Sequence, residues 1–260
     1  GYPLDKRIFP WNHANCGDLN LSGERRPQSY LRETLWSDAP VSHIVVTPPV
    51  PSFPLNPDKA DWSVWDFPDV VDHWNFPGYE GKKMTVSVYS NCEQVELFLN
   101  GESLGKQENT ADKKNTLVWE VPYAHGILKA VSYNKGGEVG TATLESAGKV
   151  EKIRLSADRT EIVADGNDLS YITLELVDSK GIRNQLAEEL VEFSIEGDAT
   201  IEGVGNANPM SIESFVANSR KTWRGSNLLV VRSGKSSGRI IVTAKVKALP
   251  VASITITQKK

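Results

Sequence analysis

The feature that most constrains the fold is a long series of short segments in which inward and outward side chains alternate, separated by turn residues. Val95, Leu97 and Leu99 alternate onto one face and are followed by Asn100-Gly101. Asn-Gly is a strong signal for a tight hairpin because both residues tolerate positive φ. The same pattern predicts strands at 84–90, 95–99, 117–123, 127–133 and 139–145. Strands this short, at this spacing, are typical of an antiparallel sandwich of immunoglobulin type.

The rest of the chain continues this pattern with an unrelated sequence. Val242, Ala244 and Val246 alternate with Thr243 and Lys245, as in a strand with one buried face. Further strands are predicted at 152–156, 171–177, 191–195, 200–204, 227–232, 239–245 and 252–257, with turns at 165–166, 179–181 and 196–198. The predicted fold is therefore mainly β, with two immunoglobulin-like β-sandwich domains at 61–147 and 148–260, which suits a chain of 260 residues.

A different kind of sequence precedes the strands. Residues 1–45 contain one convincing helix, which starts at Pro27 and ends before Pro40, since proline fits the first turn and disfavours the residue before it. A single buried face is predicted from apolar and small side chains at helical spacing, Tyr30, Leu31, Thr34 and Leu35. One helix cannot bury such a face unaided, so it must dock on the β-domains or on a partner. Residues 46–60 contain five prolines and are predicted to form a stiff, extended linker.

Composition excludes several functional classes. A net charge of −4 offers no basic surface for nucleic acid or an acidic membrane. There is no run of 18 apolar residues, so no membrane-spanning segment is expected. The four histidines are scattered, and neither Cys16 nor Cys92 lies in a Cys-x-x-Cys motif, so no metal site is predicted and the two thiols are expected to be independent. Phosphate loops, dinucleotide fingerprints and nucleophile elbows are also missing, and no cofactor is expected.

Candidate ligand contacts lie in the loop before the helix. Trp11 stands beside Asn12 and His13, in a segment with no apolar periodicity. An indole face can stack on a sugar ring and the two polar side chains can form hydrogen bonds, although a purely structural role is the alternative. Asp18 and Glu24 could be imagined as a glycosidase pair, but a retaining pair lies about 5 Å apart across a cleft. A turn residue and a solvated charge are the favoured interpretation.

Three stretches resemble glycoside hydrolase family 2, in particular its β-galactosidase branch. Residues 10–36 are similar to the end of the family's (β/α)8 barrel, with a Trp-bearing loop, a Gly-Asp-x-Asn-x-x-Gly segment at 17–23 and an Arg-Pro-x-Ser-Tyr-x-Arg helix at 26–32. Residues 74–126 resemble the sandwich domain that follows the barrel, and residues 164–225 resemble an additional C-terminal immunoglobulin-like domain. The resemblance implies that 1–45 is a barrel remnant consisting of its last loop and helix.

The resemblance also implies where the chemistry lies. These enzymes use two glutamates, one of them in an Asn-Glu pair, and both precede the Trp loop. The chain contains no Asn-Glu dipeptide and only ten residues before Trp11, so no catalytic residue is carried over. By position in the loop, Trp11 is implied as a sugar platform near the scissile bond, with Asn12 and His13 as hydrogen-bonding neighbours.

Two functions follow as hypotheses. The first is a non-catalytic C-terminal region of a retaining β-galactosidase-like enzyme that supports the barrel, its cleft or an oligomer contact. Its expected partners are the missing barrel and, through the parent enzyme, carbohydrate, and the resemblance implies export to the periplasm or beyond. The second is a free-standing carbohydrate-binding or adhesive protein, suggested by the aromatic residues between 62 and 76.

Overall fold

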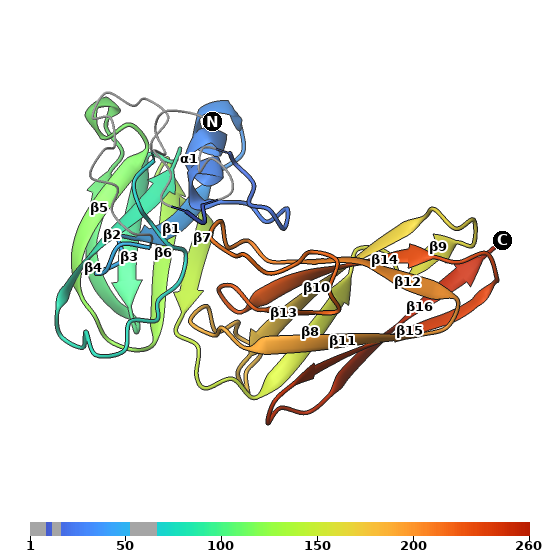
Figure 1. The fold of residues 1–260 in the computed structure, drawn as a ribbon. Coiled ribbons are helices and arrows are strands. Elements are labelled where there is room, and N and C mark those ends of the chain that lie inside the picture. Colours follow the sequence, from blue (N-terminus) through green and yellow to red (C-terminus); the bar gives the residue numbers. More distant parts are fainter. Residues whose placement is uncertain (1–8, 12–16, 53–66) are drawn as a thin grey trace. The chain divides into compact units, whose positions relative to one another are not determined.

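The structure is a computed structural model that describes residues 9–11, 17–52 and 67–260. The chain forms two compact units, Gly1–Ser146 and Ala147–Lys260 (Figure 1). Each unit has its own cluster of buried apolar side chains. The predicted mainly β architecture is confirmed, because both units are built from layered antiparallel sheets.

The first unit combines one α-helix with two sheets. Its elements are α1 (Pro27–Trp36), β1 (Ser42–Val46), β2 (Lys83–Ser90), β3 (Gln94–Leu99), β4 (Glu102–Glu108), the 3-10 helix η1 (Ala111–Lys113), β5 (Thr116–Pro122), β6 (Ile127–Asn134) and β7 (Gly137–Glu145). One sheet has the order β1-β2-β5 and the other has the order β4-β3-β6-β7. The hairpin between β3 and β4 turns at Asn100 and Gly101, whose φ angles of 52° and 89° fit the predicted Asn-Gly turn.

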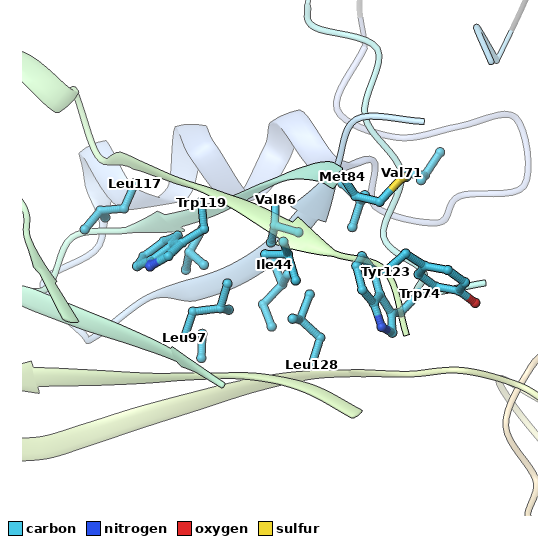
Figure 2. Close-up of a cluster of buried hydrophobic side chains, with 14 of the residues drawn as sticks. Ile44, Val71, Trp74, Met84, Val86, Leu97, Leu117, Trp119, Tyr123 and Leu128 are labelled. Atoms are coloured by element: carbon cyan, nitrogen blue, oxygen red, sulfur yellow. The ribbon is translucent and has the colours of Figure 1, made fainter. Parts of the chain in front are cut away.

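The core of the first unit lies between these two sheets. Figure 2 shows Ile44 and Val86 from one layer facing Leu97 and Leu128 from the other. Trp74 closes one end of the core, where its indole nitrogen donates a hydrogen bond of 2.8 Å to the carbonyl of Ala124. The tyrosine ring of Tyr123 packs edge-on against this indole at 4.9 Å.

Strand β1 was missed by the sequence pattern. It pairs antiparallel with β2 from Ser42 to Val46, so it belongs to the first sandwich. The predicted boundary between residues 45 and 46 therefore falls inside a strand. Ile44, Val45 and Val46 are all buried, which removes the alternation that would have marked a strand with one solvent face. Residues 53–60 of the predicted linker lie outside the described residues.

Helix α1 has the predicted bounds, with Pro27 in its first turn. The predicted buried face is confirmed at Thr34 and wrong at Leu35, which is exposed, and it lacks the polar Gln28 and Ser29, which are buried. The helix lies against β1 and β2. Polar side chains around these strands form hydrogen bonds with it, so apolar periodicity did not identify the buried face.

The second unit is a sandwich of a 4-stranded and a 5-stranded sheet. Its strands are β8 (Lys152–Ala157), β9 (Glu161–Val163), β10 (Leu169–Val177), β11 (Leu190–Glu196), β12 (Ala199–Gly205), β13 (Ser219–Lys221), β14 (Ser226–Ser233), β15 (Gly238–Val246) and β16 (Ala252–Lys259). The sheet orders are β12-β14-β10-β8 and β13-β11-β15-β16-β9. All pairs are antiparallel except β16 with β9.

The inward faces of these sheets follow the predicted alternation. Val242, Ala244 and Val246 of β15 are buried, whereas Thr243 and Lys245 are not. The short strands β9 and β13 were not predicted. Three residues are too few to show a period of two, and the central residue of β13 is an arginine.

Candidate functional site: the N-terminal loop and helix α1

The loop before α1 is closed by one asparagine side chain. The Oδ1 atom of Asn20 accepts hydrogen bonds from the backbone amides of Ser22, at 2.9 Å, and Glu24, at 3.1 Å. Its Nδ2 atom donates to the Glu24 carboxylate at 3.0 Å. Asparagine commonly closes a turn in this way, by replacing a backbone acceptor with its own side chain. Glu24 is thereby part of the loop's internal hydrogen bonding.

Further contacts join the loop to the helix. The side-chain amide of Gln28 donates to the carbonyl of Gly17 at 2.9 Å. The carboxylate of Asp18 forms an ion pair with Arg32, and the Asp18 carbonyl accepts from the backbone N–H of Arg26 at 2.8 Å. Asp18 and Glu24 thus both have structural partners, but Glu24 is half-buried and hydrogen-bonded, unlike the solvated charge that was expected.

A column of stacked side chains runs from the loop through the helix to the sheet. The Arg25 guanidinium lies 3.9 Å from the centre of the Tyr30 ring, and that ring stacks on the His43 imidazole with centroids 3.6 Å apart. Arg25 is fixed by Ser29, at 3.0 Å, and by the Glu33 carboxylate, at 2.6 Å. Cation–π and ring stacking contacts of this kind hold a helix in one orientation on a surface.

His43 occupies a position in which a charge is unfavourable. Its Nε2 atom is buried and has no hydrogen-bond partner among the described residues. Burial lowers the pKa of His43 from 6.5 to about 4, with the Asp72 carboxylate opposing and the Arg25 guanidinium adding to the shift. The imidazole is therefore neutral at physiological pH, and it serves as a flat surface for Tyr30.

Two asparagines of the sandwich hold the C-terminal half of the helix and the segment after it. The Nδ2 atom of Asn115 donates to the Thr34 hydroxyl at 3.0 Å. The Nδ2 atom of Asn91 donates to the carbonyls of Ser37 and Ala39, at 3.0 and 2.9 Å. Its Oδ1 atom accepts from the Val41 amide at 2.7 Å. Nothing in the sequence pattern identified these asparagines, because Asn91 directly follows β2 and Asn115 directly precedes β5, where asparagine is an ordinary turn residue.

The end of the helix carries large apolar side chains on its outer side. Leu35 is 65% exposed and Trp36 is 83% exposed. Leu19, Leu21 and Phe9 of the preceding loop are exposed as well. Single exposed apolar residues are common, but an exposed tryptophan next to an exposed leucine is typical of an interaction surface.

Of the three predicted sugar-contacting residues, the structure describes Trp11. Trp11 is half-buried, whereas Asn12 and His13 lie outside the described residues, so their predicted roles stay predictions. Cys92 is a free, buried thiol, and Cys16 falls among the residues not described. Across residues 9–11, 17–52 and 67–260, no three His, Cys, Asp or Glu side chains gather as metal ligands would.

Trp74 and Phe76 of the 62–76 segment belong to the core, whereas Phe67 is half-buried and its ring lies 4.5 Å from the Arg32 guanidinium. Trp74 and Phe76 are buried, as is Trp119 on β5. The rings of Trp74, Phe76 and Tyr123 pack edge-on against one another inside the core, so buried Trp74 and Phe76 present no platform for a sugar. The part of the chain that the structure describes also contains no helix long and apolar enough to cross a membrane.

Comparison with known sequence families gives two matches. Residues 153–255, which extend from β8 to the first half of β16, match glycoside hydrolase family 2 C-terminal domain 5. Residues 81–140, which cover most of the first sandwich, match a domain of unknown function, DUF4982.

Individual relatives agree with these matches. A β-galactosidase of Bacteroides ovatus is 30% identical over 97% of this chain, which spans 26% of that protein. A β-glucuronidase of Formosa agariphila is 30% identical over 76% of this chain, and the matched region covers 20% of that protein. The crystal structure of a glycosyl hydrolase family 2 member from Bacteroides cellulosilyticus superimposes with a TM-score of 0.90 and 96% identity. It is matched over 94% of this chain and 32% of its own. The chain thus spans between a fifth and a third of the length of these proteins.

Proposed function

Because this chain belongs to the C-terminal region of glycoside hydrolase family 2, we propose that it supports the catalytic domain of a retaining β-galactosidase and supplies none of the catalytic residues. In this proposal, α1 and the N-terminal loop form the surface that contacts the larger catalytic part of the enzyme.

The exposed end of α1 is the observation that carries this proposal. The helix faces the sandwich with Gln28, Ser29 and Thr34 and turns Leu35 and Trp36 outward. A helix that served only this unit would be expected to bury its apolar residues against the sheet. The reversed arrangement leaves an apolar surface for a second body, and aromatic side chains of this size often dominate such interfaces.

The first test is an assay of the purified 260-residue chain against nitrophenyl β-galactoside and nitrophenyl β-glucuronide. We expect no turnover of either compound. Asp18 is paired with Arg32 and Glu24 is bonded to Asn20, so neither is arranged as a nucleophile or an acid across a cleft. Turnover that disappears in Asp18→Asn or Glu24→Gln would refute the non-catalytic role.

The second test replaces Trp36 in the complete enzyme. We expect Trp36→Ser to lower the free energy of unfolding of the complete enzyme, followed by loss of activity in denaturant, by about 2–3 kcal/mol. This is the effect of removing a large apolar side chain from an interface. The same substitution should leave the melting temperature of the isolated chain unchanged, because Trp36 is exposed there. Tyr171→Ser, at an exposed aromatic of the second unit, is the matched control. Equal effects of Trp36→Ser on the chain and on the enzyme would contradict the proposal.

The proposed substrate of the parent enzyme is a β-galactoside, since the Bacteroides ovatus relative aligns over nearly the whole chain. The Formosa agariphila relative makes a β-glucuronide the alternative. Comparing kcat/KM of the complete enzyme for the two nitrophenyl glycosides decides between them.

A further inference from the structure

One loop of the second unit places a charge inside and apolar side chains outside. Residues 206–218 connect β12, at the edge of one sheet, to β13, at the edge of the other (Figure 1). The loop thus closes one side of the sandwich. In such a position a loop normally turns its apolar side chains toward the core and its charged ones toward water.

Arg220 lies under this loop and is fully buried. Its Nη1 atom donates to the carbonyls of Val204, at 3.3 Å, and Glu213, at 3.2 Å. Its Nη2 atom donates to the Ser211 hydroxyl at 3.0 Å. Burial lowers the pKa of Arg220, and the charge of the Glu213 carboxylate opposes this shift. A buried cation costs stability unless its hydrogen bonds are kept, and two of the three acceptors of Arg220 belong to the loop, so Arg220 fixes the loop's path.

Other contacts fix the loop from both ends. The Glu213 carboxylate accepts hydrogen bonds from the Lys221 amide, at 2.9 Å, and the Ser211 hydroxyl, at 3.0 Å. The Phe215 carbonyl accepts from the Val204 amide at 2.8 Å, so the loop also covers the edge of β12. A Cβ atom on Gly203 would lie 3.3 Å from that carbonyl oxygen, which shows how closely the loop approaches the strand.

Three of the five exposed residues of this loop are apolar, and the other two are Ser214 and Asn218. Ile212 is 77% exposed, Phe215 is 49% exposed and Val216 is 84% exposed. The Phe215 ring lies 4.2 Å from the Arg220 guanidinium, so its position is set by the buried charge. Three such residues within five positions, on a loop with fixed geometry, form an interaction surface that needs little reordering to bind.

We propose that the apolar tip of loop 206–218, formed by Ile212, Phe215 and Val216, docks on the catalytic region of the same polypeptide. The proposal rests on the proposed function and gives the second unit its own contact with that region. Most of a related enzyme lies outside this chain, which spans 26% of one relative and 32% of the family 2 structure. Three side chains bury far less than the roughly 800 Å² per partner of a stable complex between separate chains. They suffice when the partner is tethered in the same polypeptide, because its effective concentration is high.

The experiment compares amide hydrogen exchange in the complete enzyme and in the 260-residue chain. We expect the amides of residues 212–216 to exchange at least about tenfold more slowly in the complete enzyme, since docking must open before exchange. The double variant Ile212→Ser/Val216→Ser should remove this difference and lower the temperature at which the enzyme loses activity. It should leave the melting temperature of the 260-residue chain unchanged. Val163→Ser, at a residue of β9 that is 51% exposed, is the matched control and should change neither measurement.

Two results would overturn the proposal. The first is equal exchange of residues 212–216 in the two proteins. The second is self-association of the 260-residue chain in sedimentation that the double variant abolishes, which would make a second copy the occupant. Trp36→Ser keeps the two proposals apart. If it destabilises the complete enzyme while the loop variant does not, the loop proposal fails alone and the supporting role of α1 stands.

Discussion

At the scale of single residues, the stack of Tyr30 on His43 makes stability depend on pH. The pKa of His43 is about 4 in the folded chain and 6.5 when unfolded, so the unfolded state binds more protons between these values. The contribution of the neutral, buried His43 to the free energy of unfolding is full above pH 6.5 and is lost as the pH falls toward 4. We expect wild type to lose roughly 2 kcal/mol more unfolding free energy than His43→Phe between pH 7 and pH 4.5, because phenylalanine keeps the stack without a proton site. Denaturant unfolding of wild type and His43→Phe at both pH values measures this difference. Other titrating groups contribute equally to the two proteins, so their effects cancel. Parallel pH profiles would show that His43 is charged or solvated in the fold.

At the scale of elements, the docking of α1 depends on hydrogen bonds more than on apolar contact. The Asn91 side chain forms three of them with residues 37, 39 and 41. At about 1 kcal/mol each, Asn91→Ala is expected to destabilise the docked segment by roughly 2–3 kcal/mol. Amide exchange in residues 27–39 should quicken accordingly, while the amides of β3 and β6 keep their protection. Asn167→Ala, at an exposed turn asparagine, is the control. Unchanged exchange in α1 would mean that the stacked column at Tyr30 holds the helix alone.

The same elements show how far the sequence predicts the structure. Alternation located most strands, and Asn100-Gly101 identified its hairpin, because both depend on residues close together in the chain. β1 escaped because α1 covers one of its faces and the opposite sheet covers the other, which leaves three consecutive buried residues. The roles of Asn91 and Arg220 depend on partners that only folding brings close, so local sequence patterns do not predict these roles. Trp11 was selected by its polar neighbours in the loop and by the family resemblance, and its role as a sugar platform stays a prediction.

At the scale of the whole molecule, the two cores share no residue. The first is built from side chains between Ile44 and Leu144, and the second from side chains between Val150 and Ile256. Phe193→Ala removes a buried ring from the second core and is expected to lower the stability of that unit by about 3–5 kcal/mol. Leu97→Ala is the matched change in the first core, at about 2–5 kcal/mol. Methyl NMR signals followed during heating report each unit separately. We expect each variant to lower the melting temperature of its own unit and to leave the other within about one degree, since neither removes a contact from the other core. Equal loss in both units from either substitution would mean that the chain unfolds as one cooperative body.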